Sequence, residues 1–232
     1  MSFFVPVPGS KEGLESPAQR RTDDPLIDSS QSNQIPPDSR SRAYQHLVHS
    51  ARVKMRAADE CLDSILGVSI LITECFRQGN KVMLCGNGGS AADAQHMAAE
   101  FVSRLSKDIV RPGLPAIALT TDTSFLTSFA NDFGYEGVFE RQVRALGKPG
   151  DILVGISTSG NSPNVTRSVM AAREMGLKTV GLLGQGGELT TLVHEAVVVP
   201  SEDTQLIQET LLAIEHVICL LVERALFGTP AT

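Results

Sequence analysis

The sequence has no dense run of lysine or arginine, no long uninterrupted apolar run and no pair of cysteines at Cys-x-x-Cys spacing. A nucleic-acid-binding protein usually presents a clustered basic face, and the net charge of −6 also argues against that class. The best apolar segments are interrupted by Glu74, Arg77, Glu215 and Glu223, which argues against a bilayer span. We therefore expect a protein that binds neither nucleic acid nor a membrane.

The cysteines and the first residues bear on the cellular compartment. Cys61, Cys75 and Cys219 lie in apolar helical patterns, and Cys85 ends a strand-like run. This placement favours four buried, reduced thiols over disulfides. Residues 1–5 lack the basic region and the apolar stretch of a secretory signal. The sequence therefore predicts a cytoplasmic protein.

The 232 residues are enough for one domain with a real hydrophobic core, and 42% of them are apolar. Residues 1–42 differ from the rest because they hold half of the prolines, many serines and mixed charges. Such a segment has little apolar surface to offset the entropy lost on ordering. We predict a disordered tail over residues 1–42 and a folded domain over residues 43–228.

From residue 43 onward, helical and strand-like patterns alternate. Apolar residues at three- and four-residue spacing predict helices over about residues 43–66 and 68–76. Strands are predicted at residues 81–85, 116–119, 151–156, 178–183 and 196–199, and further helices at 90–105, 124–129, 138–146, 164–175 and 204–226. This order predicts an α/β fold, a three-layer αβα sandwich whose five-stranded parallel sheet is flanked by N- and C-terminal helices.

The loop Gly86-Asn87-Gly88-Gly89-Ser90 follows the first predicted strand and precedes a helix. Parallel sheets bind ligands at the carboxyl ends of their strands. Glycines let backbone N–H groups approach an oxyanion, and the helix N-terminus adds partial positive charge. Ser90 is expected to cap this helix and to donate to a phosphate. A plain tight turn with a serine cap fits the loop equally well, and neither the G-x-G-x-x-G spacing nor a P-loop lysine is present.

A second polar loop follows the third predicted strand. Four hydroxyl side chains and one glycine fall within the six residues Ser157-Thr158-Ser159-Gly160-Asn161-Ser162. Hydroxyl and backbone N–H donors can hold a phosphate without lysine or arginine. A polar linker is the alternative for this loop alone. Two such loops after two parallel strands favour one phosphate site between them.

Two helices present ionisable side chains at helical spacing. His96 and Glu100 are four residues apart and share a face, and Gln208 and His216 are two turns apart on the last helix. These four residues suit a divalent metal site of the zinc type. They equally suit a carboxylate base with an imidazole acid. The third interpretation is that His96 and Glu100 form a surface pair and that His216 is a hydrogen-bonded core histidine, and spacing alone favours this one.

Residues 85–100, 130–134 and 155–162 together resemble the phosphoheptose isomerases, the sedoheptulose 7-phosphate isomerases of the sugar-isomerase (SIS) domain superfamily. The resemblance covers about residues 43–228, and the serine-rich loop alone would indicate only the superfamily. It implies the SIS fold, a homotetramer with active sites between subunits, and one zinc per subunit. It implies isomerisation of sedoheptulose 7-phosphate to D-glycero-D-manno-heptose 7-phosphate, the first step of nucleotide-activated heptose synthesis, often for lipopolysaccharide.

The resemblance also implies roles for single residues. Glu100 is the implied base between C1 and C2, His216 the partner acid/base, and Arg104 falls where the family usually has arginine. The implied substrate-binding residues are Asn87, Gly88, Gly89, Ser90, Glu100, Asn131, Asp132, Ser157, Thr158, Ser159, Ser162 and Gln208. The implied zinc ligands are His96, Glu100, Gln208 and His216.

Two departures and two rival functions remain at this point. Leu206 replaces a common arginine, and Gln205 stands where a small or acidic residue is usual. One rival is a non-catalytic adaptor that binds a replication initiator, although such a relative is expected to lose Glu100 or His216, and both are present. The other rival is an isomerase or sensor of a different phosphosugar. The sequence shows no glutaminase or DNA-binding domain, so neither an amidotransferase nor a sugar-responsive repressor is expected.

Overall fold

The computed structural model describes residues 35–228, so the predicted disordered tail lies largely outside the described residues. Residues 43–228 lie within one compact unit. The first helix, α1 (Ser39–Glu60), begins at Ser39 rather than at Ala43 as predicted. The limits of the tail therefore stay a prediction, while the helical start is four residues earlier than expected.

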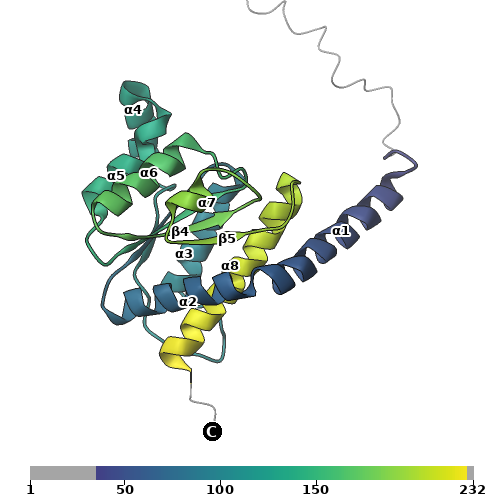
Figure 1. Ribbon diagram of the computed structural model, residues 1–232, viewed down its shortest axis with the longest axis horizontal. Coiled ribbons are helices and arrows are strands. Elements are labelled where there is room, and N and C mark those ends of the chain that lie inside the picture. Colours follow the sequence, from purple (N-terminus) through teal and green to yellow (C-terminus); the bar gives the residue numbers. More distant parts are fainter. Residues whose placement is uncertain (1–34, 229–232) are drawn as a thin grey trace, which may run out of the picture. The chain divides into compact units, whose positions relative to one another are not determined.

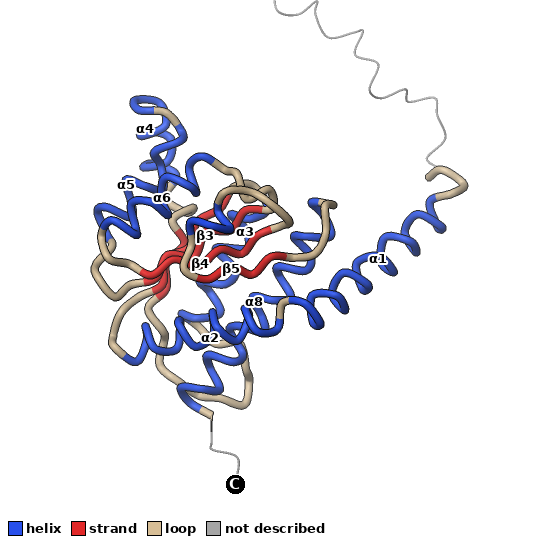
Figure 2. Tube along the Cα trace, viewed as in Figure 1, coloured by secondary structure: helices blue, strands red, loops and turns tan. Residues whose placement is uncertain are grey.

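A five-stranded sheet forms the centre of this unit, as Figure 2 shows. Its strands are β1 (Val82–Gly86), β2 (Ala116–Ala118), β3 (Ile152–Ser157), β4 (Lys178–Leu183) and β5 (Glu195–Val198). All neighbours are parallel, in the order β2-β1-β3-β4-β5. The strand order reverses between β1 and β3, which is the point where open α/β sheets bind ligands. The predicted parallel sheet is confirmed.

Helices cover both faces of the sheet, which confirms the three-layer sandwich (Figure 1). On one face lie α2 (Leu62–Arg77), α3 (Gly89–Val102) and α8 (Thr204–Phe227), and on the other α5 (Val138–Leu146), α6 (Pro163–Glu174) and α7 (Leu189–Leu192). Alternate strand residues serve the two cores: Leu84 and Val154 pack with the first set, Met83 and Leu153 with the second. This two-sided burial explains why the strands are continuously apolar.

Several element limits differ from the sequence-based prediction. The first two helices break at Cys61 rather than near residue 67, because apolar spacing continues across the break. The helix predicted to residue 105 ends at Val102. Helix α4 (Thr123–Phe133) is longer than predicted, and a 3-10 turn (Tyr135–Gly137) follows it. The four-residue α7 is too short to leave a periodic pattern, so it was not predicted.

Within residues 35–228, no helix combines the length and apolar composition that a bilayer crossing requires. The four cysteines are buried free thiols. Burial raises the pKa of the Cys85 thiol to about 12, so that group is protonated and unreactive at neutral pH.

Candidate active site

The loop after β1 leads directly into α3. Gly88 occupies the N-cap position with a φ of 55°, a backbone conformation that favours glycine, and α3 begins at Gly89. The expectation that Ser90 caps this helix is wrong, because Ser90 lies inside the first turn and is buried. The N–H groups of a first helical turn have no partner within the helix. The loop therefore keeps the donors and the partial positive charge that suit a phosphate.

The loop after β3 gathers its hydroxyl groups around Ser157. The Ser157 hydroxyl lies 3.0 Å from that of Ser162 and 3.4 Å from that of Ser159. Gly160 has a φ of 65°, and a Cβ there would lie 2.5 Å from the Gly186 carbonyl oxygen. The chain thus needs glycine for this turn. The result is a cluster of neutral donors at the carboxyl end of β3.

Two asparagines tie the two loops together. The side-chain amides of Asn87 and Asn164 donate to each other's oxygen, both at 2.9 Å, and the Tyr135 hydroxyl donates to Asn87 at 3.2 Å. These residues border a cavity of about 180 Å³ together with Glu136 and Ser162. Sequence reasoning missed Asn164 and Tyr135, and the only available signal was a second asparagine next to the serine-rich loop.

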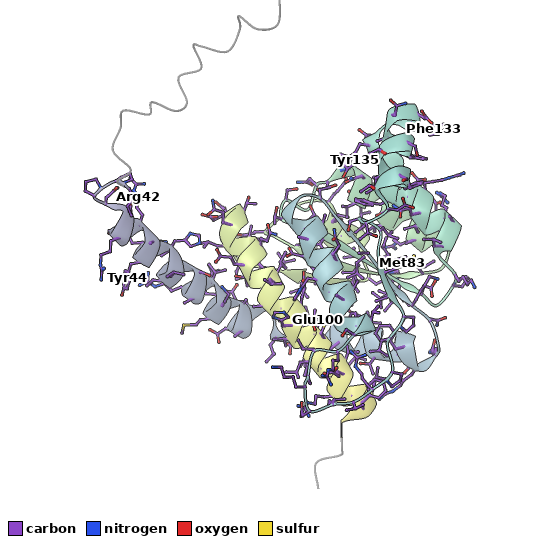
Figure 3. All side chains as sticks on the ribbon, turned by 180° about the vertical axis from the view of Figure 1, so that it is seen from behind. Arg42, Tyr44, Met83, Glu100, Phe133 and Tyr135 are labelled. Carbon is purple, nitrogen blue, oxygen red and sulfur yellow. The ribbon has the colours of Figure 1, made fainter. Side chains whose placement is uncertain are left out.

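Three potential metal ligands converge between α3 and α8. The Nε2 atoms of His96 and His216 lie 2.7 Å apart, and His96 Nε2 lies 3.7 Å from a Glu100 carboxylate oxygen. One ligand atom from each residue falls within 4.8 Å of the others. Figure 3 labels Glu100 where α3 and α8 lie side by side. Two imidazole nitrogens and one carboxylate oxygen form a donor set that suits zinc. We call these three residues the histidine–glutamate cluster.

Gln208 connects the first loop to α3. A Cβ on Gly89 would lie 2.1 Å from both amide atoms of Gln208, so a larger residue there would have to displace this side chain. Gln208 is also hydrogen-bonded to the buried Asp93. Burial raises the pKa of Asp93, and this hydrogen bond and the nearby His96 oppose the rise. Gln208 thus lies against the phosphate loop, and its role as a fourth metal ligand stays a prediction.

A second buried acid adjoins the histidine–glutamate cluster on α8. The Glu215 side chain is fully buried, and neither carboxylate oxygen has a hydrogen-bond partner within the described residues. Burial, reinforced by the charge of Asp93, raises the pKa of Glu215 to about 9. Glu215 is therefore a neutral acid at pH 7 and adds no negative charge beside His216.

Asn131 and Asp132 lie elsewhere, at the exposed end of α4. The Asn131 amide donates to Asp132 at 2.9 Å, and Asp132 lines a cavity of about 470 Å³ between α4 and α5. Figure 3 labels the neighbouring Phe133 and Tyr135 in this region. Thr158 is half-buried in the second loop. Substrate contact by Asn131, Asp132 and Thr158 remains a prediction.

Comparison with known proteins shows to which family this chain belongs. The family model for the SIS domain matches residues 45–184. A phosphoheptose isomerase of Roseiflexus sp. (strain RS-1) is 52% identical over 194 residues, which cover 83% of this chain and 98% of that protein. Another, from Clostridium acetobutylicum, is 49% identical over 179 residues, covering 77% of this chain and 90% of that protein. The chain belongs to the phosphoheptose isomerase family.

Solved phosphoheptose isomerases share the backbone. The enzyme from Neisseria gonorrhoeae is 40% identical with a TM-score of 0.75, and the match covers 79% of this chain and 98% of that one. The enzyme from Francisella tularensis is 33% identical with a TM-score of 0.77, covering 80% and 98%. The fold expected of a phosphoheptose isomerase is thus confirmed for the described residues.

Proposed function

We propose that this member of the phosphoheptose isomerase family converts sedoheptulose 7-phosphate to D-glycero-D-manno-heptose 7-phosphate in heptose biosynthesis. The observation that supports this most is the convergence of His96, Glu100 and His216 within 4.8 Å. Two of these residues lie on the helix that begins at the first phosphate loop. A proton-transfer group and a phosphate anchor are therefore built on the same element.

The phosphate is held by local donors rather than by the overall field. The protein carries a net charge of −6, which opposes long-range attraction of an anion. Backbone N–H groups and hydroxyls at the two strand ends supply uncharged donors at short range. The phosphate-binding residues in this proposal are Asn87, Gly88, Gly89 and Ser90 in the first loop and Ser157, Thr158, Ser159 and Ser162 in the second.

Glu100 and His216 move the protons in this proposal. The Glu100 carboxylate takes the proton from C1 of the ketose, which leaves an enediolate, and returns it to C2 to form the aldose. The His216 imidazole gives a proton to the oxygen on C2 and accepts the proton from the oxygen on C1. Each proton removed is returned, so the step needs no external oxidant or reductant.

We also infer that one zinc per subunit is held by His96, Glu100 and His216, with Gln208 as the fourth ligand. The convergence of two imidazole nitrogens with a carboxylate oxygen supports this assignment. When bound, zinc supplies positive charge that stabilises the negatively charged oxygens of the enediolate.

A homotetramer and a cytoplasmic location complete the proposal. Exposed apolar side chains lie on α1, α2 and α8, among them Leu47, Met55, Ile70 and Leu220. A groove of about 360 Å³ between α2 and α8 is lined by Leu66, Ile70 and Leu221 together with polar residues. Such apolar surface is typical of interfaces between subunits. The four free thiols favour a reducing compartment.

The test uses purified protein with sedoheptulose 7-phosphate, with and without zinc, and follows the aldoheptose 7-phosphate by NMR. Glu100→Gln should reduce kcat by about 100- to 10,000-fold and leave the affinity for phosphate nearly unchanged. The exposed Glu188 provides a matched control, and Glu188→Gln should behave like wild type. Phosphosugar binding without turnover by the wild type would favour the adaptor or a different phosphosugar.

A further inference from the structure

A buried ion pair contacts the end of α3, the helix that carries His96 and Glu100. The side chains of Arg111 in the α3–β2 connection and Glu223 on α8 are each 1% exposed, and Arg111 Nε lies 2.7 Å from the Glu223 carboxylate. The same carboxylate accepts the backbone N–H groups of Leu105 at 3.3 Å and Ser106 at 2.8 Å. Burial alone would raise the pKa of Glu223, but hydrogen bonds from Ser106 and Arg111 lower it. The carboxylate is thus ionised and fully partnered at neutral pH.

The other nitrogens of Arg111 reach the end of α3. Nη2 donates to the Glu100 carbonyl at 2.8 Å, and Nη1 donates to the Phe101 carbonyl at 2.8 Å. The last carbonyls of a helix have no partner within it and carry partial negative charge. A guanidinium is well suited to satisfy two of them at once. Arg111 therefore caps the helix that presents His96 and Glu100.

The ion pair also fixes the chain on both sides of Arg104. Arg111 holds the Phe101 carbonyl before it, and Glu223 holds the Leu105 N–H after it. Arg104 itself is exposed and lies between these two anchored positions. Its backbone is thus restrained although its side chain extends from the surface.

Glu223 and His216 belong to the same helix, seven residues apart. Seven residues are close to two helical turns, so the two side chains leave α8 in similar directions. The ion pair therefore joins α8 to the end of α3, and these are the two helices whose side chains meet in the histidine–glutamate cluster.

We propose that Arg111 and Glu223 are positioning residues, which hold Glu100 in the geometry that isomerisation needs and restrain the backbone around Arg104. The proposal deepens the proposed function and depends on it for the reaction that is served. Neither residue touches the cluster through its own side chain in the hydrogen bonds described above. They act through the Glu100 carbonyl and the backbone around Arg104. A displacement of about 1 Å at a reacting group can reduce a rate about 100-fold.

The experiment compares Arg111→Lys and Glu223→Gln with the wild type in the zinc-loaded full-length protein. Both variants keep the size of the side chain, and circular dichroism and light scattering first establish that they fold and assemble. We expect kcat to fall about 10- to 100-fold. The dissociation constant for inorganic phosphate should stay within about twofold, because the first phosphate loop lies at the start of α3 and the ion pair contacts its end. The dissociation constant for zinc, measured by competition with a chelator, should rise about tenfold.

Two control variants separate positioning from general stability. Asp108→Asn removes an exposed ion pair between Asp108 and Arg224, whose atoms lie 2.8 Å apart. This pair joins α8 to the α3–β2 connection but does not involve α3. Val169→Ala opens a cavity on the opposite face of the sheet. Both should keep wild-type kcat and zinc affinity, and Val169→Ala should nevertheless lower Tm.

Folded Arg111→Lys and Glu223→Gln proteins with wild-type kcat and zinc affinity would overturn the proposal. Equal losses of kcat in Val169→Ala would overturn it as well, since stability alone would then explain the effect. If the wild type fails to isomerise sedoheptulose 7-phosphate, the proposed function fails. The zinc titration still decides in that case whether the ion pair positions Glu100.

Discussion

At the residue scale, the absence of one side-chain atom shapes the site. The Gln208 amide lies so close to Gly89 that a Cβ on residue 89 would be 2.1 Å from the amide atoms. Gly89→Ala must therefore displace Gln208 or the first turn of α3. We expect zinc affinity and kcat each to fall at least about tenfold, because Gln208 contacts both the loop and Asp93.

Chelator competition and NMR turnover measure both effects of Gly89→Ala. The control is Ala92→Ser, since Ala92 is exposed in the same first turn. Wild-type zinc affinity in Gly89→Ala would show that the position of Gln208 does not matter to the metal.

Glu215 gives a second residue-scale prediction, on the pH dependence of stability. Burial raises the pKa of Glu215 to about 9, so the folded protein keeps a proton that the unfolded chain releases above about pH 4.3. The stabilisation is fully present below that pH and decreases by up to about 1.4 kcal/mol per pH unit as the pH rises toward 9. Glu215→Gln stays neutral at every pH and should flatten this dependence.

Urea unfolding of the metal-free protein between pH 6 and pH 8.5 measures the slope. Glu188→Gln, at an exposed position, should keep the wild-type slope. Identical slopes in Glu215→Gln and wild type would mean that Glu215 ionises in the folded state as readily as in water.

At the element scale, the start of α8 determines where Gln208 and His216 lie. The Asp203 carboxylate accepts the N–H groups of Gln205 at 2.9 Å and Leu206 at 3.4 Å, which caps the helix. Asp203→Ala should lower the free energy of unfolding by about 1 kcal/mol. Urea unfolding measures this change, and Glu202→Ala, just outside the helix, should change it by less than about 0.5 kcal/mol. Equal effects of the two variants would contradict the capping role.

At the scale of the whole molecule, the proposed tetramer depends on the apolar surface of α1, α2 and α8. Ile70 is 68% exposed and lines the groove between α2 and α8. Ile70→Glu would place a charge in a buried interface, so we expect smaller species by light scattering and reduced turnover per chain.

Met170 offers the matched control for the interface. It is 49% exposed on α6, which covers the other face of the sheet. Met170→Glu should leave both mass and turnover unchanged. A tetrameric, fully active Ile70→Glu would place the interface elsewhere.

The sequence by itself determined the parts that depend on local spacing. Continuous apolar runs indicated buried parallel strands, and the glycine and serine loops at their ends marked the ligand edge. The four-residue spacing of His96 and Glu100 put them on one helical face, as the structure has them. These features are local, because the periods of helices and strands fix which side chains share a face.

Only the tertiary structure decided which helix faces and which loops lie against one another. The family resemblance implied one site for His96 and His216, but their spacing did not, and the structure brings the two imidazoles together across 120 residues. It also paired Asn87 with Asn164. It also joined Arg111 to Glu223, which no spacing in the sequence connects. Contacts of this kind depend on how whole helices pack against the sheet. Packing is set by many side chains together, so no single motif can reveal it.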